Sequence, residues 1–191
     1  MKKYLFIILV GMLFTSCSTT TEKETRNLDS FDKINVVGNV ELHLEKNSDH
    51  SMEVMAKNTS ALANLITEVR NGELYVYTKK DGANWKNPKY VIYINHSGIS
   101  DITMTGAITL RSDDDINTKD LAINGRGVLK GNLEVAVNTL SVDLKGVSTM
   151  YISGYANTAN LEVSGIGFMN AGSLETKNGK DNSRGIALIH K

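Results

Sequence analysis

The chain has 191 residues, of which 41% are hydrophobic and 22% are charged, and its 21 basic residues balance its 21 acidic residues. This composition excludes a wholly disordered chain and predicts one folded domain. Without an excess of basic residues, nothing predicts a nucleic-acid partner.

The first seventeen residues have the composition of an export signal. Lys2 and Lys3 are followed by an apolar run over 4–14, which is too short to span a membrane, and then by Thr15-Ser16-Cys17. Cys17 is the only cysteine of the chain, so disulfides and cysteine-ligated metal sites are excluded once it is modified. The segment resembles a bacterial lipoprotein signal, which implies lipidation of Cys17 and anchoring to a membrane. The alternative is a plain signal peptide with an incidental cysteine.

The segment 18–27 contains no apolar side chain, and we expect it to be a flexible polar tether. Without residues 1–17 the chain keeps 19 basic and 21 acidic residues, a formal charge of −2. The folded domain is therefore predicted over 28–191.

Short strands separated by turns are predicted along the first half of the domain. Residues 59–69 have apolar side chains at helical spacing behind Thr59 or Ser60 as a helix cap, although their β-branched residues also suit a strand. Asn71-Gly72 is the strongest turn signal, and the segment 80–89 is predicted to be an exposed loop. The predicted strands are 34–36, 40–44, 52–56, 74–77 and 90–94.

From residue 102 onward a short phrase recurs, with two alternating apolar residues before a glycine. Taking that glycine as the anchor gives intervals of 19, 21, 19 and 20 residues. A period this regular predicts stacked coils of about 20 residues, in which backbone groups pair between coils and glycines allow sharp corners. The alternative is a sandwich of short strands. The anchor glycines are Gly106, Gly125, Gly146, Gly165 and Gly185.

The repeat, the phrases "GELYVYTK" and "YVIYI", and the pair Trp85-Lys86 resemble the head GIN domain of "putative autotransporter adhesins". The resemblance covers residues 28–191, although only Gly125-Arg126-Gly127 and Gly165-Ile166-Gly167 keep both glycines of the family's phrase. It implies an all-β, right-handed parallel β-helix-like solenoid without an established activity. It also implies an exported lipoprotein of the Gram-negative cell envelope, in the outer membrane.

Candidate catalytic and metal-binding groups are scattered. The run Asp113-Asp114-Asp115 offers oxygen ligands for calcium but lacks the spacing of an EF-hand and a glycine within the run, so we expect a solvated turn between strands. The histidines lack the spacing of a zinc site, and we expect no metal and no cofactor. The histidines are His43, His50, His96 and His190. Charged residues that would suit carbohydrate chemistry, or simply the wet face of a sheet, are Arg126, Lys130, Asp143, Lys145 and Glu162.

Aromatic residues are concentrated between 75 and 93. Outward rings on neighbouring strands would form a platform for a sugar or a protein partner, whereas the alternative is mutual packing across the strands. The candidate ligand-binding residues are Tyr75, Tyr77, Trp85, Tyr90 and Tyr93.

The sequence ends on the apolar strand "GIALIHK", an open edge that predicts weak self-association through the C-terminal end. Together these features favour a non-enzymatic lipoprotein of the cell envelope that presents a sheet surface to a glycan or an envelope protein. The alternatives are a carbohydrate-active β-helix enzyme and a structural or regulatory interaction protein.

Overall fold

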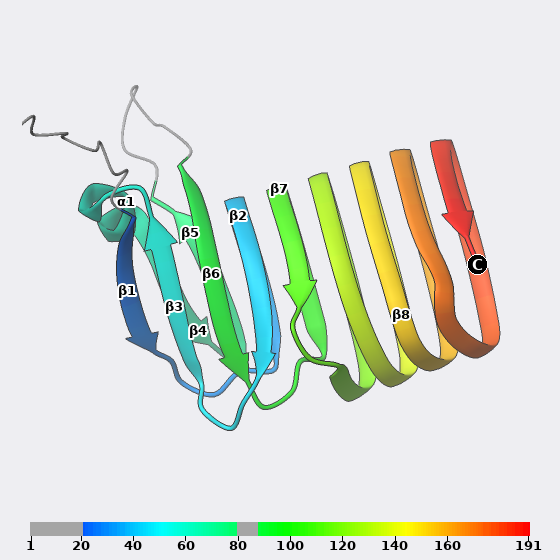
Figure 1. The fold of residues 1–191 in the computed structure, drawn as a ribbon, viewed down its shortest axis with the longest axis horizontal. Helices are drawn as coiled ribbons and strands as arrows, with labels where there is room; N and C mark the ends of the chain where they lie inside the picture. Colours follow the sequence, from blue (N-terminus) through cyan, green and yellow to red (C-terminus); the bar gives the residue numbers. More distant parts are fainter. Residues whose placement is uncertain (1–20, 80–87) are drawn as a thin grey trace, which may run out of the picture.

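The computed structural model describes residues 21–79 and 88–191. The prediction of an all-β protein is confirmed, because strands dominate both ranges and one short helix interrupts them. The strands belong to one sheet, which curls into an open trough (Figure 1). The elements are β1 (Glu22–Asn27), β2 (Lys33–Lys46), β3 (Ser51–Ala56), α1 (Thr59–Asn64), β4 (Leu65–Arg70), β5 (Glu73–Thr78), β6 (Lys89–His96), β7 (Asp101–Ser112) and β8 (Ile116–His190).

Strand β2 connects the parts of the sheet because it changes neighbours at Gly38, where φ is +142°. Before this glycine, residues 33–37 pair in parallel with β5, and after it residues 39–46 pair in parallel with β6. On its other side β2 pairs with β7 from Lys33 to Leu44. We call the residues before and after such a glycine the first leg and the second leg of a strand.

The N-terminal end of the sheet is closed by antiparallel strands. β1 pairs with β3 and β3 pairs with β6, while β4 pairs with β5 (Figure 1). The sequence predicted residues 22–27 to be part of a flexible tether, and the structure corrects this boundary. These residues are polar because β1 is an edge strand whose side chains are mostly exposed, so strand formation there needs no apolar face.

The helix and strand alternatives for residues 59–69 are both realised in turn. α1 is capped by Asn58, whose side chain accepts a hydrogen bond from the Ala61 amide, rather than by Thr59 or Ser60. The chain then continues as β4. Asn71 and Gly72 both have positive φ, at 52° and 76°, and form the predicted turn between β4 and β5.

The repeated region consists of parallel neighbours about twenty residues apart along the chain, from 19 to 21 between successive stacked glycines. Residues Asp101 to Arg111 of β7 pair with Ala122 to Asn132 of β8, so the partners are 21 residues apart. One column of glycines marks the bend of each successive coil. Each of these glycines has positive φ, and each one after Gly38 lies against the backbone of the glycine before it, so that a Cβ atom would meet a carbonyl oxygen. The stacked glycines are Gly38, Gly106, Gly127, Gly146, Gly165 and Gly185.

The choice of Gly125 as an anchor was wrong. The partner of Gly106 is Gly127, and Gly125 is paired with Met104. Gly125 is a buried, inward position, where an added Cβ would collide with the Leu129 side chain rather than with backbone. The other four anchors lie in the stacked column.

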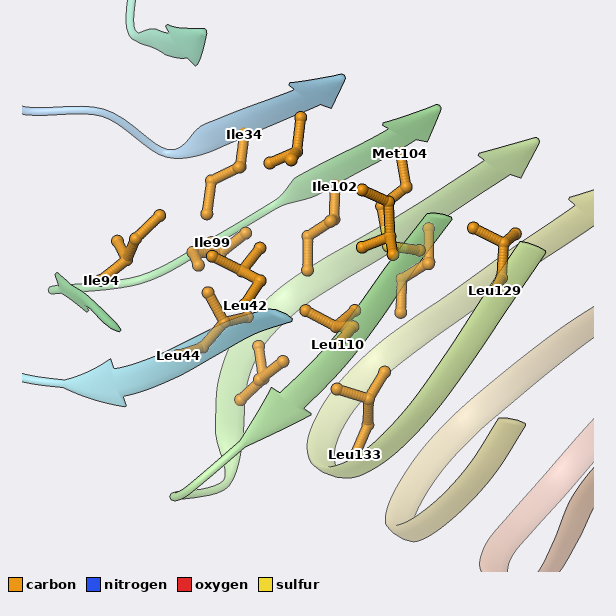
Figure 2. Close-up of a cluster of buried hydrophobic side chains, with 14 of the residues drawn as sticks. Ile34, Leu42, Leu44, Ile94, Ile99, Ile102, Met104, Leu110, Leu129 and Leu133 are labelled. Atoms are coloured by element: carbon orange, nitrogen blue, oxygen red, sulfur yellow. The ribbon is translucent and has the colours of Figure 1, made fainter. Parts of the chain in front are cut away.

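The core fills the trough between the two legs. Inward residues from both legs of successive strands are fully buried, and Figure 2 shows Ile34 and Ile102 of first legs facing Leu42 and Leu110 of second legs. Because the inward residues are aliphatic and repeat from strand to strand, the coils are stabilised mainly by apolar contacts with their neighbours. The buried polar side chains among the described residues are His96 and Ser148.

Candidate binding groove

Tyr75 and Tyr77 lie on the outer side of β5, each half-buried and each held by a carboxylate. The Tyr75 hydroxyl donates to Glu73 at 2.6 Å and the Tyr77 hydroxyl donates to Glu68 at 2.8 Å. These hydrogen bonds raise the pKa of both tyrosines. The Arg70 guanidinium lies 4.5 Å from the centre of the Tyr75 ring. These rings therefore pack across neighbouring strands.

The other predicted aromatic residues do not join them in one platform. Tyr90 is fully buried, and its hydroxyl donates to the Ala61 carbonyl at 2.9 Å, so the prediction of an outward ring is wrong there. Tyr93 lies on β6, which pairs with the second leg of β2, whereas β5 pairs with the first leg. Its ring stacks on His43 at 4.5 Å. Trp85 lies outside the described residues.

The acidic run at 113–115 is occupied by contacts within the chain. Asp113 approaches His43 at 3.4 Å, Asp114 accepts from the Lys46 amide at 3.2 Å, and Asp115 lies 3.9 Å from the Lys46 ammonium. In residues 21–79 and 88–191, no three His, Cys, Asp or Glu side chains are grouped so as to hold a metal ion.

The five charged residues considered for carbohydrate chemistry do not converge on one site. Arg126, Asp143 and Lys145 line a groove of about 300 Å³, in which the Lys145 ammonium pairs with Asp143 at 2.5 Å. Glu162 does not line this groove, and Lys130 lines a different one. The smaller groove thus contains one carboxylate, whereas glycoside hydrolysis ordinarily needs two.

The larger groove, of about 680 Å³, runs over the outer face of the coils. Counting from the stacked glycines shows how the fold builds it. Thr109, Lys130 and Thr149 lie three residues after their glycines, and a second row lies five residues after them. Because alternate residues share a face of a strand, both rows point outward. The second row is Arg111, Asn132, Tyr151 and Asn170, and Ser153 and Ser173 complete the polar lining.

Tyr151 is the aromatic side chain of this groove. It is exposed at 47%, and the ring of Phe168 meets it edge to face at 6.2 Å. This contact orients the ring while leaving much of it accessible to a ligand. We call the larger groove, with its hydroxyl, amide, cationic and aromatic groups, the outer groove.

Sequence reasoning named Lys130 but missed Arg111 and Tyr151. The signal that would have found them is their distance from the stacked glycines, because each lies five residues after one of them, Gly106 for Arg111 and Gly146 for Tyr151. Tyr90 could also have been placed correctly, because it alternates with Ile92 and Ile94, which were predicted to face inward.

The fold and the outer groove define an all-β domain whose accessible chemistry is suited to binding. The family described as "Putative auto-transporter adhesin, head GIN domain" matches residues 30–189. The chain belongs to this family, as its sequence resemblance implied. No curated protein matches the chain.

Three solved structures share the fold. A "putative adhesin" of Bacteroides fragilis NCTC 9343 is 20% identical with a TM-score of 0.81, and covers 90% of this chain and 80% of its own. A "putative adhesin" of Parabacteroides distasonis ATCC 8503 is 16% identical with a TM-score of 0.81, and the match covers 91% of this chain and 74% of that protein. A "putative lipid binding protein" of the same strain is 18% identical with a TM-score of 0.63, and the match covers 91% of this chain and 97% of that protein.

In the two described ranges, the helix is too short to cross a membrane. The similar proteins are named for adhesion or lipid binding rather than for catalysis, and at these identities they inform the fold alone.

Proposed function

We propose that this protein is a lipid-anchored, non-enzymatic protein of the bacterial cell envelope that binds a glycan or protein ligand on the outer face of its coils. Its membrane anchor is the lipid on Cys17, and its cell location is the outer membrane of a Gram-negative bacterium. The export signal and the adhesin-named family support this location.

In this proposal the repeated region is a right-handed parallel β-helix-like solenoid of about 20 residues per coil. The parallel pairing of β7 with β8 at an offset of 21 residues and the column of stacked glycines support it. A solenoid suits a binding role because equivalent positions on successive coils form rows of side chains at a spacing of about 4.8 Å.

The observation that carries the proposal is the composition of the outer groove. Hydroxyl and amide groups at its walls match the hydroxyl groups of a sugar, and the accessible ring of Tyr151 offers an apolar face on which a sugar ring can stack. The volume of about 680 Å³ is in the usual range of small-ligand sites.

A glycan array probed with the purified protein tests the function, and Tyr151→Ser tests the site. We expect binding to a defined set of glycans, and loss of that binding in Tyr151→Ser. Tyr155→Ser is the matched control, because Tyr155 is exposed at 39% and does not line the outer groove. Failure to bind any glycan, together with capture of an envelope protein, would leave only the protein-ligand version.

The C-terminal edge is proposed as a site of weak self-association. Ile186 and Leu188 are exposed at 78% and 59%, and the strand has no charged side chain from Gly185 to Ile189 to prevent edge pairing. By contrast, β1 at the opposite end has Lys23, Glu24 and Arg26. Sedimentation should show concentration-dependent association that Leu188→Lys abolishes, and a monomer at every concentration would refute it.

A further inference from the structure

The outer groove has an excess of positive charge. Arg111 and Lys130 are among its lining residues, and no Asp or Glu side chain is. Arg111 is the strand partner of Asn132, and Lys130 is the strand partner of Thr109, so the two cations are diagonal neighbours on the same face. In parallel strands about 4.8 Å apart, with a rise of about 3.3 Å per residue, such diagonal neighbours are roughly 8 Å apart at the backbone, close enough for both side chains to reach one ligand.

These two charges are weakly compensated by the protein. Lys130 has no ion pair with any residue of the described ranges, and Arg111 has one long contact, 3.7 Å from its Nε to Glu41. Glu41 is itself bound by the Lys89 ammonium at 2.7 Å, and this hydrogen bond lowers the pKa of Glu41. The guanidinium of Arg111 therefore keeps donors that can bind a ligand group, and guanidinium forks fit carboxylate, sulfate and phosphate groups.

The remaining groups of the groove are suited to an uncharged, hydroxyl-rich part of the same ligand. Thr109 and Thr149 flank Lys130 in its row, and Asn132 lies between Arg111 and Tyr151 in the second row. Each can exchange hydrogen bonds with sugar hydroxyls, while the Tyr151 ring can stack on a pyranose face.

Resting on the proposed function, we propose that the ligand of the outer groove is an acidic saccharide. Arg111 and Lys130 bind its anionic group, Tyr151 stacks on a neighbouring sugar ring, and the hydroxyl and amide side chains bind the sugar hydroxyls. A carboxylate and a sulfate ester share the required chemistry, and separate probes distinguish these two sources.

Isothermal titration of the purified protein with digalacturonate, a sulfated heparin disaccharide and neutral digalactose tests this assignment. At low salt we expect at least one acidic probe to bind about tenfold or more tightly than digalactose, and we expect this preference to shrink as salt is added. The acidic probe that binds more tightly identifies the preferred anionic group.

Arg111→Gln and Lys130→Gln should each weaken the binding of the acidic probe about tenfold and leave the affinity for digalactose unchanged. The matched controls are Arg184→Gln and Lys180→Gln, which remove exposed cations outside the outer groove and should change nothing. Thermal unfolding of all four variants checks that they remain folded.

The failure of this inference and of the proposed function can be told apart. If digalactose binds as tightly as both acidic probes and Tyr151→Ser abolishes that binding, the acidic class is wrong and the glycan-binding function stands. If neither acidic probe binds and the array is also blank, both this inference and the glycan-binding version of the proposed function are wrong. Undiminished acidic binding in Arg111→Gln and Lys130→Gln would also overturn the assignment.

Discussion

The antiparallel end of the sheet and the repeated coils are held in different ways. From β1 to β6, side chains make polar contacts across long stretches of sequence, as when Arg26 donates to the carbonyls of Leu62 and Leu65 at 3.0 and 2.8 Å. In the coils, the side-chain hydrogen bonds are few, and the bend of each strand depends on a glycine packed against the previous glycine. The first region thus depends on particular side chains, and the second depends on the absence of a side chain in one column.

The largest loss of stability is expected from adding one carbon atom to the column of stacked glycines. In Gly127→Ala the new Cβ would collide with the Gly106 carbonyl, at a residue whose φ of +126° is unfavourable for alanine. Backbone strain and overpacking together should lower the free energy of unfolding by about 3–5 kcal/mol, measured by urea denaturation.

Two glycines provide controls for this change. Gly125→Ala meets the flexible end of Leu129 at an ordinary φ and should cost about 1–2 kcal/mol. Gly98→Ala has nothing within 4 Å of its Cβ and should change stability by less than about 0.5 kcal/mol. Equal losses for Gly125→Ala and Gly127→Ala would contradict the glycine column.

In the antiparallel end, the largest loss is expected from Arg26→Gln. The guanidinium of Arg26 binds two carbonyls at the end of α1 and is mostly buried, so its removal leaves acceptors without their charged donor. We expect a loss of about 2 kcal/mol and faster amide exchange in α1. Lys23→Gln, which removes an exposed ion pair with Glu53, should cost less than about 1 kcal/mol and leave that exchange unchanged.

A smaller loss is expected from Tyr90→Phe, which removes only the buried hydroxyl that donates to Ala61. Urea denaturation should show a loss of about 1 kcal/mol, the usual net contribution of one hydrogen bond. Tyr75→Phe removes a hydroxyl of a half-exposed residue and is the control. A null effect in Tyr90→Phe would mean that the contact between β6 and α1 contributes only through packing.

The smallest effect on stability at neutral pH is expected from substitution of His96, because the contribution of this residue changes only when the protein is acidified. Burial lowers the pKa of His96, with His50 and Lys46 acting in the same direction and Asp114 opposing them. The unfolded chain therefore takes up a proton at this residue more readily than the folded chain does. The free energy of unfolding should fall as the pH decreases through about 6.5, the pKa of a histidine in the unfolded chain.

His96→Leu should flatten this dependence when urea denaturation is compared at pH 7.5 and pH 5. His190→Leu, which changes an exposed histidine, should keep the slope of the unmodified protein. An unchanged slope in His96→Leu would show that other groups determine the acid sensitivity.

The sequence predicted much of the fold because alternation and turn chemistry are local. The Asn71-Gly72 turn, the inward Ile92 and Ile94, and the spacing of the coils follow from neighbouring residues. The register of the coils does not follow from neighbouring residues. Gly125 and Gly127 are only two residues apart, and the pairing of Gly106 with Gly127 is what distinguishes them. The apolar residues Leu121 and Ile123 favoured the wrong one.

The candidate site was less predictable for a related reason. The outer groove gathers Arg111, Lys130 and Tyr151 from three coils, so no window of sequence contains it. The aromatic residues at 75–93 were predicted to form one site because they are close in sequence. In the structure Tyr90 faces the core, and Tyr93 lies on a strand that pairs with the second leg of β2. Proximity along the chain is a poor guide where neighbours across coils are about twenty residues apart.

The column of stacked glycines also makes the molecule extensible. A tandem duplication of one segment of 19 to 21 residues, cut at equivalent glycines, would insert a coil without altering the contacts of those on either side. Each insertion would lengthen every row of the outer groove by one residue, so gene duplication could adapt this scaffold to longer polymers while leaving the antiparallel end unchanged.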